Sequence, residues 1–329
     1  MPCNRNWVFY VASETNFHPS KLVWEKKDKF AAHTQAMKSK GYIIITALLF
    51  LTTASYAQQM SYGFRAGLSY SSFVGPSEVN DDGESLESFG FASGFHIGFA
   101  VDYAVTDLFG FRGELLFSQR GTDYTYEGDS YYFLKRNEPG EEKLVFGKRK
   151  VDMGVSMANL EIPFAVYYKL GSFEILAGIN IGVLMTSTGG GSLDFSNGVS
   201  QSGSPVDSFV ITLQHNYSKD GARQAGPSNL PILVDGAIVV TPGSTGAYYD
   251  YDVKNKNIYQ TFDFGLTGGL AFYLNEGLFI SARVVYGLTD LDRNEYDISY
   301  QKLDSDDNYI QRADKNTNLT IQASIGFMF

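Results

Sequence analysis

The sequence predicts an all-β fold: an eight-stranded antiparallel up-and-down transmembrane β-barrel with long external loops. Three observations support this prediction. Apolar and polar residues alternate with a period of two in eight segments, the connections between segments are alternately short and long, and the 329-residue chain is rich in glycine (34) and aromatic residues (15%). A period of two is the pattern of a strand with two different faces, and this composition suits a β-rich chain with many turns.

Each of the eight segments has one apolar face and one face of glycine and polar residues. In the first segment, Phe64 and Leu68 stand on one face and Arg65 on the other. The segments cover residues 62–70, 95–103, 109–120, 158–169, 173–183, 262–272, 278–287 and 319–329. Their lengths are close to the roughly 9–11 residues that a tilted strand needs to cross a bilayer. A closed barrel also pairs every backbone polar group, which lipid requires.

The connections between these segments are alternately tight and long. The tight ones are 104–108, 170–172 and 274–277, and the long ones, rich in Gly, Ser, Asp and Tyr, are 74–90, 125–152, 188–259 and 289–316. Outer-membrane barrels have short periplasmic turns and longer external loops. Since every odd-numbered connection is long, we expect both ends of the barrel on the periplasmic side.

The N-terminal region has the three-part pattern of a secretory signal peptide. Basic Met37–Lys40 precedes an apolar run from Gly41 to Leu51, and small residues at Ser55 and Ala57 fit cleavage after Ala57. We therefore expect a signal peptide at 37–57, a barrel at 58–329, and a gene-model extension or unstructured leader at 1–36. The one cysteine, Cys3, precedes this signal, so the mature chain would hold no disulfide and no cysteine-based zinc site.

The charges on the polar faces indicate that the apolar faces point outward. A soluble barrel of the lipocalin type would instead have its apolar face inside. Here the polar face carries both charge signs, which can satisfy each other in the narrow interior of an eight-stranded barrel. Aromatic residues are also frequent toward the strand ends, as in interfacial girdles. The predicted polar network of the lumen, with a structural role, consists of Arg65, His96, Asp102, Arg112, Glu114, Glu161, Glu174, Asp263 and Arg283.

Signatures of catalysis and of metal binding are weak in this chain. There is no nucleophile elbow and no phosphate-binding loop. The run from Asp304 to Asn308 begins like a calcium loop but has Tyr309 where glycine is required. The acidic loop 74–90 (Glu78, Asp81, Asp82, Glu84 and Glu87) could attract divalent cations, although solubilising charge explains it more simply. We predict no enzyme activity, no cofactor and no metal site.

Several stretches resemble the outer-membrane β-barrel domain family that includes PorT-like proteins. They are GFRAGLSYSSF (63–73), ELLFSQRG (114–121), LEIP (160–163) and the terminal IQASIGFMF (321–329), and the resemblance extends over about residues 58–329. It implies an eight-stranded barrel in the outer membrane of a Gram-negative bacterium. It also implies that the last strand, which ends in Phe329, is recognised by the barrel-assembly machinery.

The expected function is that of an outer-membrane protein of structural, binding or secretion-accessory type that presents long external loops. The expected partners are outer-membrane lipids, the barrel-assembly machinery and an unknown extracellular ligand or envelope protein. Nucleic acid is not expected, because the net charge is −10. The alternatives are a small-solute channel, a lumen-binding soluble barrel, and a lipid hydrolase that would use His96, or His215 with Asp207 and Ser208.

Overall fold

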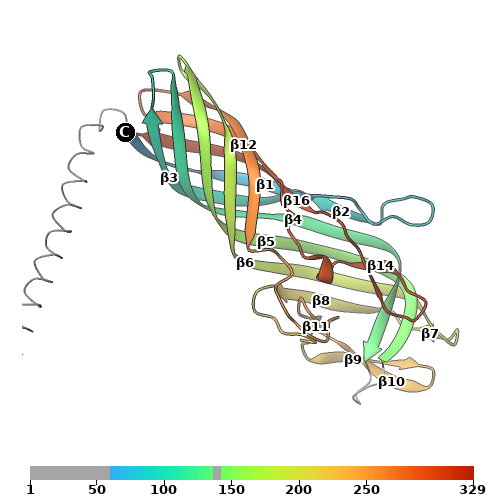
Figure 1. Ribbon diagram of the computed structural model, residues 1–329. Helices are drawn as coiled ribbons and strands as arrows, with labels where there is room; N and C mark the ends of the chain where they lie inside the picture. Colours follow the sequence, from blue (N-terminus) through green and yellow to red (C-terminus); the bar gives the residue numbers. More distant parts are fainter. Residues whose placement is uncertain (1–59, 136–141) are drawn as a thin grey trace, which may run out of the picture. The chain divides into compact units, whose positions relative to one another are not determined.

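Strands dominate the computed structural model, which describes residues 60–135 and 142–329 (Figure 1). The expected signal peptide at 37–57 and the segment 1–36 lie outside the described residues. Within the described part, no helix is long and apolar enough to cross a membrane.

Eight of the strands form a closed ring. Each pairs antiparallel with the next along the ring, and the last pairs with the first. They are β1 (Met60–Val74), β3 (Ala92–Ala104), β4 (Phe109–Lys135), β5 (Glu142–Leu170), β6 (Phe173–Ser200), β12 (Phe262–Tyr273), β13 (Leu278–Gly287) and β16 (Thr317–Met328). The predicted tight connections join β3 to β4, β5 to β6 and β12 to β13 at one end of the ring.

The apolar faces of these strands point out of the ring. Phe99 is 72% exposed and Leu68 is 58% exposed, whereas Arg65 and Arg112 are each only 1% exposed. An apolar exterior around a charged interior is the reverse of a soluble barrel and is what a surrounding lipid phase requires. The alternative of an apolar lumen is therefore wrong.

Three strands are much longer than the sequence predicts. The predicted loop 125–152 is mostly strand, because β4 and β5 stay paired as far as Lys135 and Glu142. In the same way, β6 continues through the first part of the predicted loop 188–259. The period-two pattern persists here. On the N-terminal side of Leu160, however, the outward residues of β5 change from apolar to polar. Their composition therefore looks like that of a loop, although the backbone is strand.

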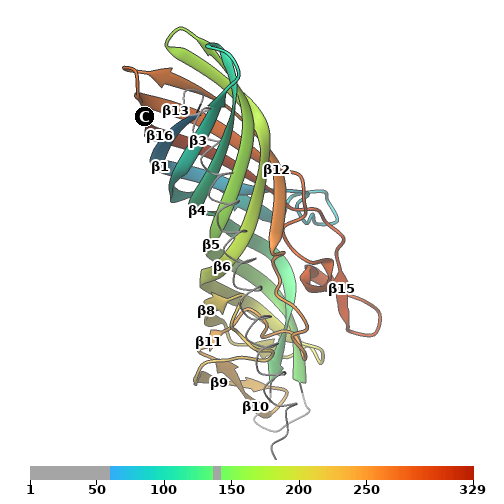
Figure 2. The same cartoon turned by 60° about the vertical axis from the view of Figure 1, so that its left-hand side comes forward.

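The extended parts of β4, β5 and β6 form an external sheet with shorter strands (Figures 1 and 2). β2 (Glu87–Gly90) pairs with β4, while β7 (Pro205–Val206) and β8 (Phe209–Asn216) pair with β6. β11 (Ser244–Thr245) pairs parallel with β8. Two hairpins lie outside this sheet: β9 (Ser228–Val234) with β10 (Ala237–Pro242), and β14 (Ile298–Leu303) with β15 (Tyr309–Gln311), the latter preceded by the 3₁₀ turn η2 (Asn294–Tyr296).

The external part has its own hydrophobic core, in two clusters. The distal cluster includes Val145, Val151, Phe195, Phe209 and Ile211. The proximal cluster, nearer the ring along β5, includes Phe73, Val155, Tyr217, Tyr259 and Tyr296. Because these side chains are removed from water, the external part is a packed structure rather than a set of free loops.

Candidate functional site

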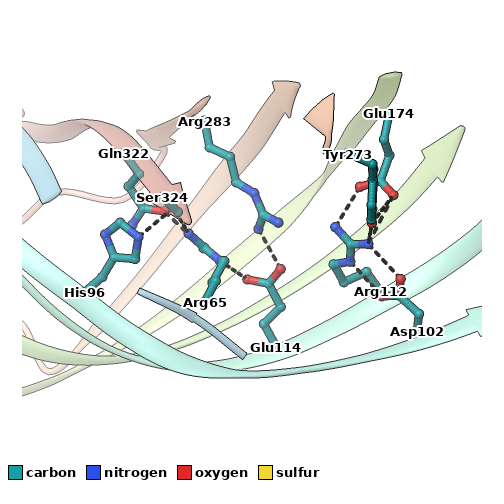
Figure 3. Close-up of polar contacts among 10 residues, drawn as sticks. All are labelled: Arg65, His96, Asp102, Arg112, Glu114, Glu174, Tyr273, Arg283, Gln322 and Ser324. Atoms are coloured by element: carbon teal, nitrogen blue, oxygen red, sulfur yellow. Dashed lines mark hydrogen bonds and ion pairs between the residues drawn. The ribbon is translucent and has the colours of Figure 1, made fainter. Parts of the chain in front are cut away.

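The lumen of the ring is filled by a network of ion pairs (Figure 3). Arg112 on β4 donates from Nε and Nη2 to the two carboxylate oxygens of Asp102 at 2.6 and 2.7 Å. Its Nη1 donates to Glu174 at 2.7 Å, and its Nη2 also contacts the hydroxyl of Tyr273 at 3.2 Å. A forked guanidinium between two carboxylates is a strong, geometrically specific pairing.

A second group of the network is centred on Glu114. Its carboxylate accepts from Arg65 Nε at 2.9 Å and forms an ion pair with Arg283 Nη1 at 2.7 Å. Arg65 also donates to Ser324 and Gln322 of β16 at 2.9 and 3.1 Å. These contacts join opposite sides of the ring through its interior, as Figure 3 shows.

A third group includes Arg120, which the prediction of the network omitted. Its Nη2 lies 2.9 Å from Asp263 and 3.3 Å from Asn159, and its Nη1 lies 3.8 Å from Glu161. Arg120 stands on the polar face of the predicted segment 109–120, so the alternation was sufficient to find it. All nine predicted network residues are at most 7% exposed.

His96 lies in the lumen between two serine hydroxyls. Its Nδ1 is 3.0 Å from the hydroxyl of Ser69, and its Nε2 is 2.7 Å from that of Ser324. Asp102 is six residues further along β3, about 20 Å at the rise of a strand, and pairs with Arg112 instead. A serine next to a histidine suggests a hydrolase, but the other ring nitrogen contacts a serine rather than an orienting carboxylate.

The external part contains a cavity of about 200 Å³ between the distal and proximal clusters. Its walls come from β1, β2, β4, β5, β6 and β8, from Tyr217, and from the segments 245–259 and 292–316. Aromatic side chains form much of this wall: Phe73, Phe89, Tyr124, Tyr132, Tyr217, Tyr249, Tyr251, Tyr259, Tyr296 and Tyr300. We call this space the external cavity.

Two acidic residues of the predicted loop 74–90 contact the segments around the external cavity, and one of them, Glu87, lines it. Glu78 accepts from the hydroxyl of Ser299 and from the backbone N–H of Tyr300. Glu87 forms an ion pair with Arg312 at 2.7 Å. Both glutamates are buried. The interpretation of these two as solubilising charge is therefore wrong: they join loops that are far apart in sequence.

His215 lies in the wall of the external cavity. Burial lowers its pKa to about 4, so the imidazole is neutral at physiological pH. Its Nδ1 is 3.3 Å from the hydroxyl of Tyr217. Within the described residues, no hydrogen bond joins His215 to Asp207 or Ser208, the partners considered for a hydrolase.

Five polar atoms on residues that line the external cavity are buried and have no hydrogen-bond partner within the described part of the chain. Three are acceptors, namely Asp292 Oδ1, Asp297 Oδ2 and Asn316 Oδ1, one is a donor, Arg149 Nε, and the fifth is the hydroxyl of Tyr132. Such groups are costly in a folded protein unless water or a ligand satisfies them. No group of three or more metal-ligating side chains occurs among the described residues.

Asp292 and Asp297 make the external part sensitive to pH. Burial, with help from Asp290 for the first, raises their pKa values to about 7 and about 6. An unfolded segment loses these protons near pH 3.9, so the folded segment binds more protons between about pH 4 and 7. Its stability therefore falls as pH rises through that window.

We expect residues 289–300 to exchange amide hydrogens faster at pH 8 than at pH 5.5, after correction for intrinsic rates. The charged carboxylates destabilise the folded segment at the higher pH. Asp292→Asn should reduce this difference, while Asp81→Asn, at an exposed side chain, should not. An unchanged pH dependence in Asp292→Asn would contradict the assignment.

An antiparallel ring with an apolar exterior, a charged interior of buried side chains and a large external part is the architecture of a membrane-spanning β-barrel protein. The chain belongs to the family described as outer membrane protein beta-barrel domain, which matches residues 56–293. It is accordingly a protein of the outer membrane. No curated protein matches the chain.

Solved outer-membrane proteins share a loose likeness with the chain. The attachment invasion locus protein Ail of Yersinia pestis, in complex with the heparin analogue sucrose octasulfate, is 11% identical, with 82% of this chain and 99% of that chain covered and a TM-score of 0.31. Neisserial surface protein A is 8% identical, with 82% and 97% covered and a TM-score of 0.32. OprG from Pseudomonas aeruginosa is 12% identical, with 82% and 95% covered and a TM-score of 0.30. Such TM-scores do not bear on function.

Proposed function

We propose that the chain is an eight-stranded transmembrane barrel that binds a small molecule outside the membrane, in the external cavity. The observation that carries this proposal is a packed, aromatic-lined space whose wall residues hold buried polar atoms without partners. Ligand sites are concave and mostly apolar, with a few placed polar groups. The long strands β4, β5 and β6 hold this site away from the lipid.

The lumen contributes stability rather than transport in this proposal. The side chains of Arg112, Glu114 and Arg65 fill the interior that a solute would have to cross. Side chains normally fill an eight-stranded interior. This favours a binding protein over the small-solute channel. The burial of His96, which is 1% exposed, likewise favours a non-enzymatic role.

The membrane contacts follow from the same proposal. Outer-membrane lipids surround the apolar exterior, and the last strand, β16, with Phe329 after it, is the segment that the barrel-assembly machinery would recognise. The PorT-like resemblance remains part of this proposal, as does an envelope protein as a further partner.

A bulky side chain in the external cavity tests the binding function. Ile258 lines the cavity and is partly buried, whereas Val253 is in the same loop, 62% exposed and outside the cavity wall. We expect a small molecule to co-purify with the wild type and with Val253→Trp but not with Ile258→Trp, as measured by mass spectrometry. A heat-modifiability gel checks that each variant is folded. The same small molecules in all three samples, or none in any, would contradict the proposal.

A further inference from the structure

One side of the external cavity is rich in hydrogen-bond acceptors, and Arg312, which lines the cavity there, is already paired with Glu87, Asp297 and Asp314. Asp292, Asp297 and Asn316 have unpartnered oxygens, and Asn316 is only 7% exposed. These residues lie beside Leu291 and Tyr296 of the proximal cluster, and Asn316 Nδ2 is 3.4 Å from Asp292. Well above pH 7, where both carboxyl groups are ionised, the carboxylate and amide oxygens accept but do not donate. A ligand group with several N–H donors and a positive charge would complement this side.

The other side of the cavity offers a buried donor. Arg149 is 4% exposed, its Nε has no partner within the described residues, and its guanidinium lies 4.5 Å from the ring centroid of Tyr300. Its Nη2 donates to the backbone carbonyl of Tyr131 at 2.7 Å. On β5, Arg149 is nearer to Val151 of the distal cluster than to Val155 of the proximal cluster, so the donor is on the distal side of the cavity. The acceptors are on the proximal side, beside Leu291 and Tyr296.

Several tyrosines between these sides have already donated their hydroxyl hydrogens, whereas the buried hydroxyl of Tyr132 has no partner within the described residues. Tyr251 donates its hydroxyl hydrogen to the carbonyl of Tyr296, and Tyr296 donates to that of Lys256. Tyr124 donates to Glu87. Because their hydrogens are donated within the protein, these hydroxyls can only accept hydrogen bonds from a ligand. Ring faces attract an ammonium group by cation–π interaction, so the wall favours an organic cation.

We propose that the external cavity binds a small zwitterion. Its ammonium group contacts Asp292, Asp297 and the neighbouring tyrosine rings, and its carboxylate contacts Arg149. The volume of about 200 Å³ equals that of roughly seven waters at ~30 Å³ each, which is room for a short chain or one ring between the two charged groups. This inference rests on the proposed binding function and specifies its ligand class.

Titration calorimetry with ω-amino acids tests the zwitterion directly. The probes are 4-aminobutyrate, 6-aminohexanoate and 8-aminooctanoate, with hexylamine and hexanoate as probes that carry one charge. We expect at least one amino acid to bind more tightly than either single-charge probe. Equal affinity of all probes, or tighter binding of hexanoate or hexylamine, would overturn the inference.

Two variants test which residue binds each charged end of the ligand. Arg149→Gln should weaken the best amino acid about tenfold, because one charged hydrogen bond is lost, and leave hexylamine unchanged. Asp292→Asn should weaken both the amino acid and hexylamine but not hexanoate. The matched controls are Lys150→Gln, an exposed neighbour on β5, and Asp81→Asn. Equal losses in a variant and its control would contradict the assignment.

The outcome also separates this inference from the proposed function. If a small molecule co-purifies with the wild type and is lost in Ile258→Trp, the binding function stands. If that molecule is not a zwitterion and no amino acid probe binds, the inference about ligand class is wrong. If nothing co-purifies and no probe binds, both are wrong.

Discussion

Arg112→Ala is expected to lower the free energy of unfolding by about 3–5 kcal/mol, the effect of removing one partner from a buried charge network. Without the guanidinium, the buried carboxylates of Asp102 and Glu174 remain in the lumen without their cation. Unfolding by urea in detergent micelles, followed by the heat-modifiability gel, measures the change.

The matched control for this variant is Arg223→Ala. Arg223 forms ion pairs with Glu142 and Asp252, but its side chain is 34% exposed. Partly exposed pairs contribute about 0–1 kcal/mol, so this variant should be nearly as stable as the wild type. Equal losses in both variants would contradict a stabilising lumen network.

Phe99→Arg should lower the stability by about 2–4 kcal/mol, the cost of an arginine on the lipid-facing side of a barrel near the bilayer midplane. Phe99 is in the middle of β3, is 72% exposed and points away from the ring. Its charge would have to enter the hydrocarbon. The same urea titration, in lipid vesicles, measures this loss.

Val210→Arg is the control for the lipid-facing variant. Val210 is 57% exposed on β8, which belongs to the external sheet rather than to the ring. An added charge there faces water and should change the stability little. A large loss of stability in Val210→Arg, or no loss in Phe99→Arg, would show that the membrane boundary is assigned to the wrong part of the chain.

The faces of the ring strands could be predicted because they depend on local alternation. Each residue of a strand points to one side or the other, so an arginine at position 65 or 112 between apolar neighbours must enter the lumen. The partners inside the lumen could not be predicted in the same way. His96 contacts Ser324, 228 residues later, and such a pair depends on the register of several strands.

The external cavity was not predictable, because its walls come from segments that look like loops. Polar outward residues such as Lys148 and Asp152 hide the strand pattern of β5 beyond the membrane. The cavity also combines β4 and β5 with residues near positions 250 and 300, and no local pattern relates them. The signal peptide at 37–57 stays a prediction, since it lies outside the described residues.

Single cysteines along the outward face of β5 test the central claim most directly. Cys3 is the one native cysteine and is replaced by serine. Spin labels at Ile162→Cys and Val166→Cys should be relaxed by oxygen and shielded from a water-soluble paramagnet. Labels at Lys148→Cys and Asp152→Cys should show the reverse. If the labels at 162 and 166 are as accessible to the water-soluble agent as those at 148 and 152, the apolar exterior of the ring does not contact lipid.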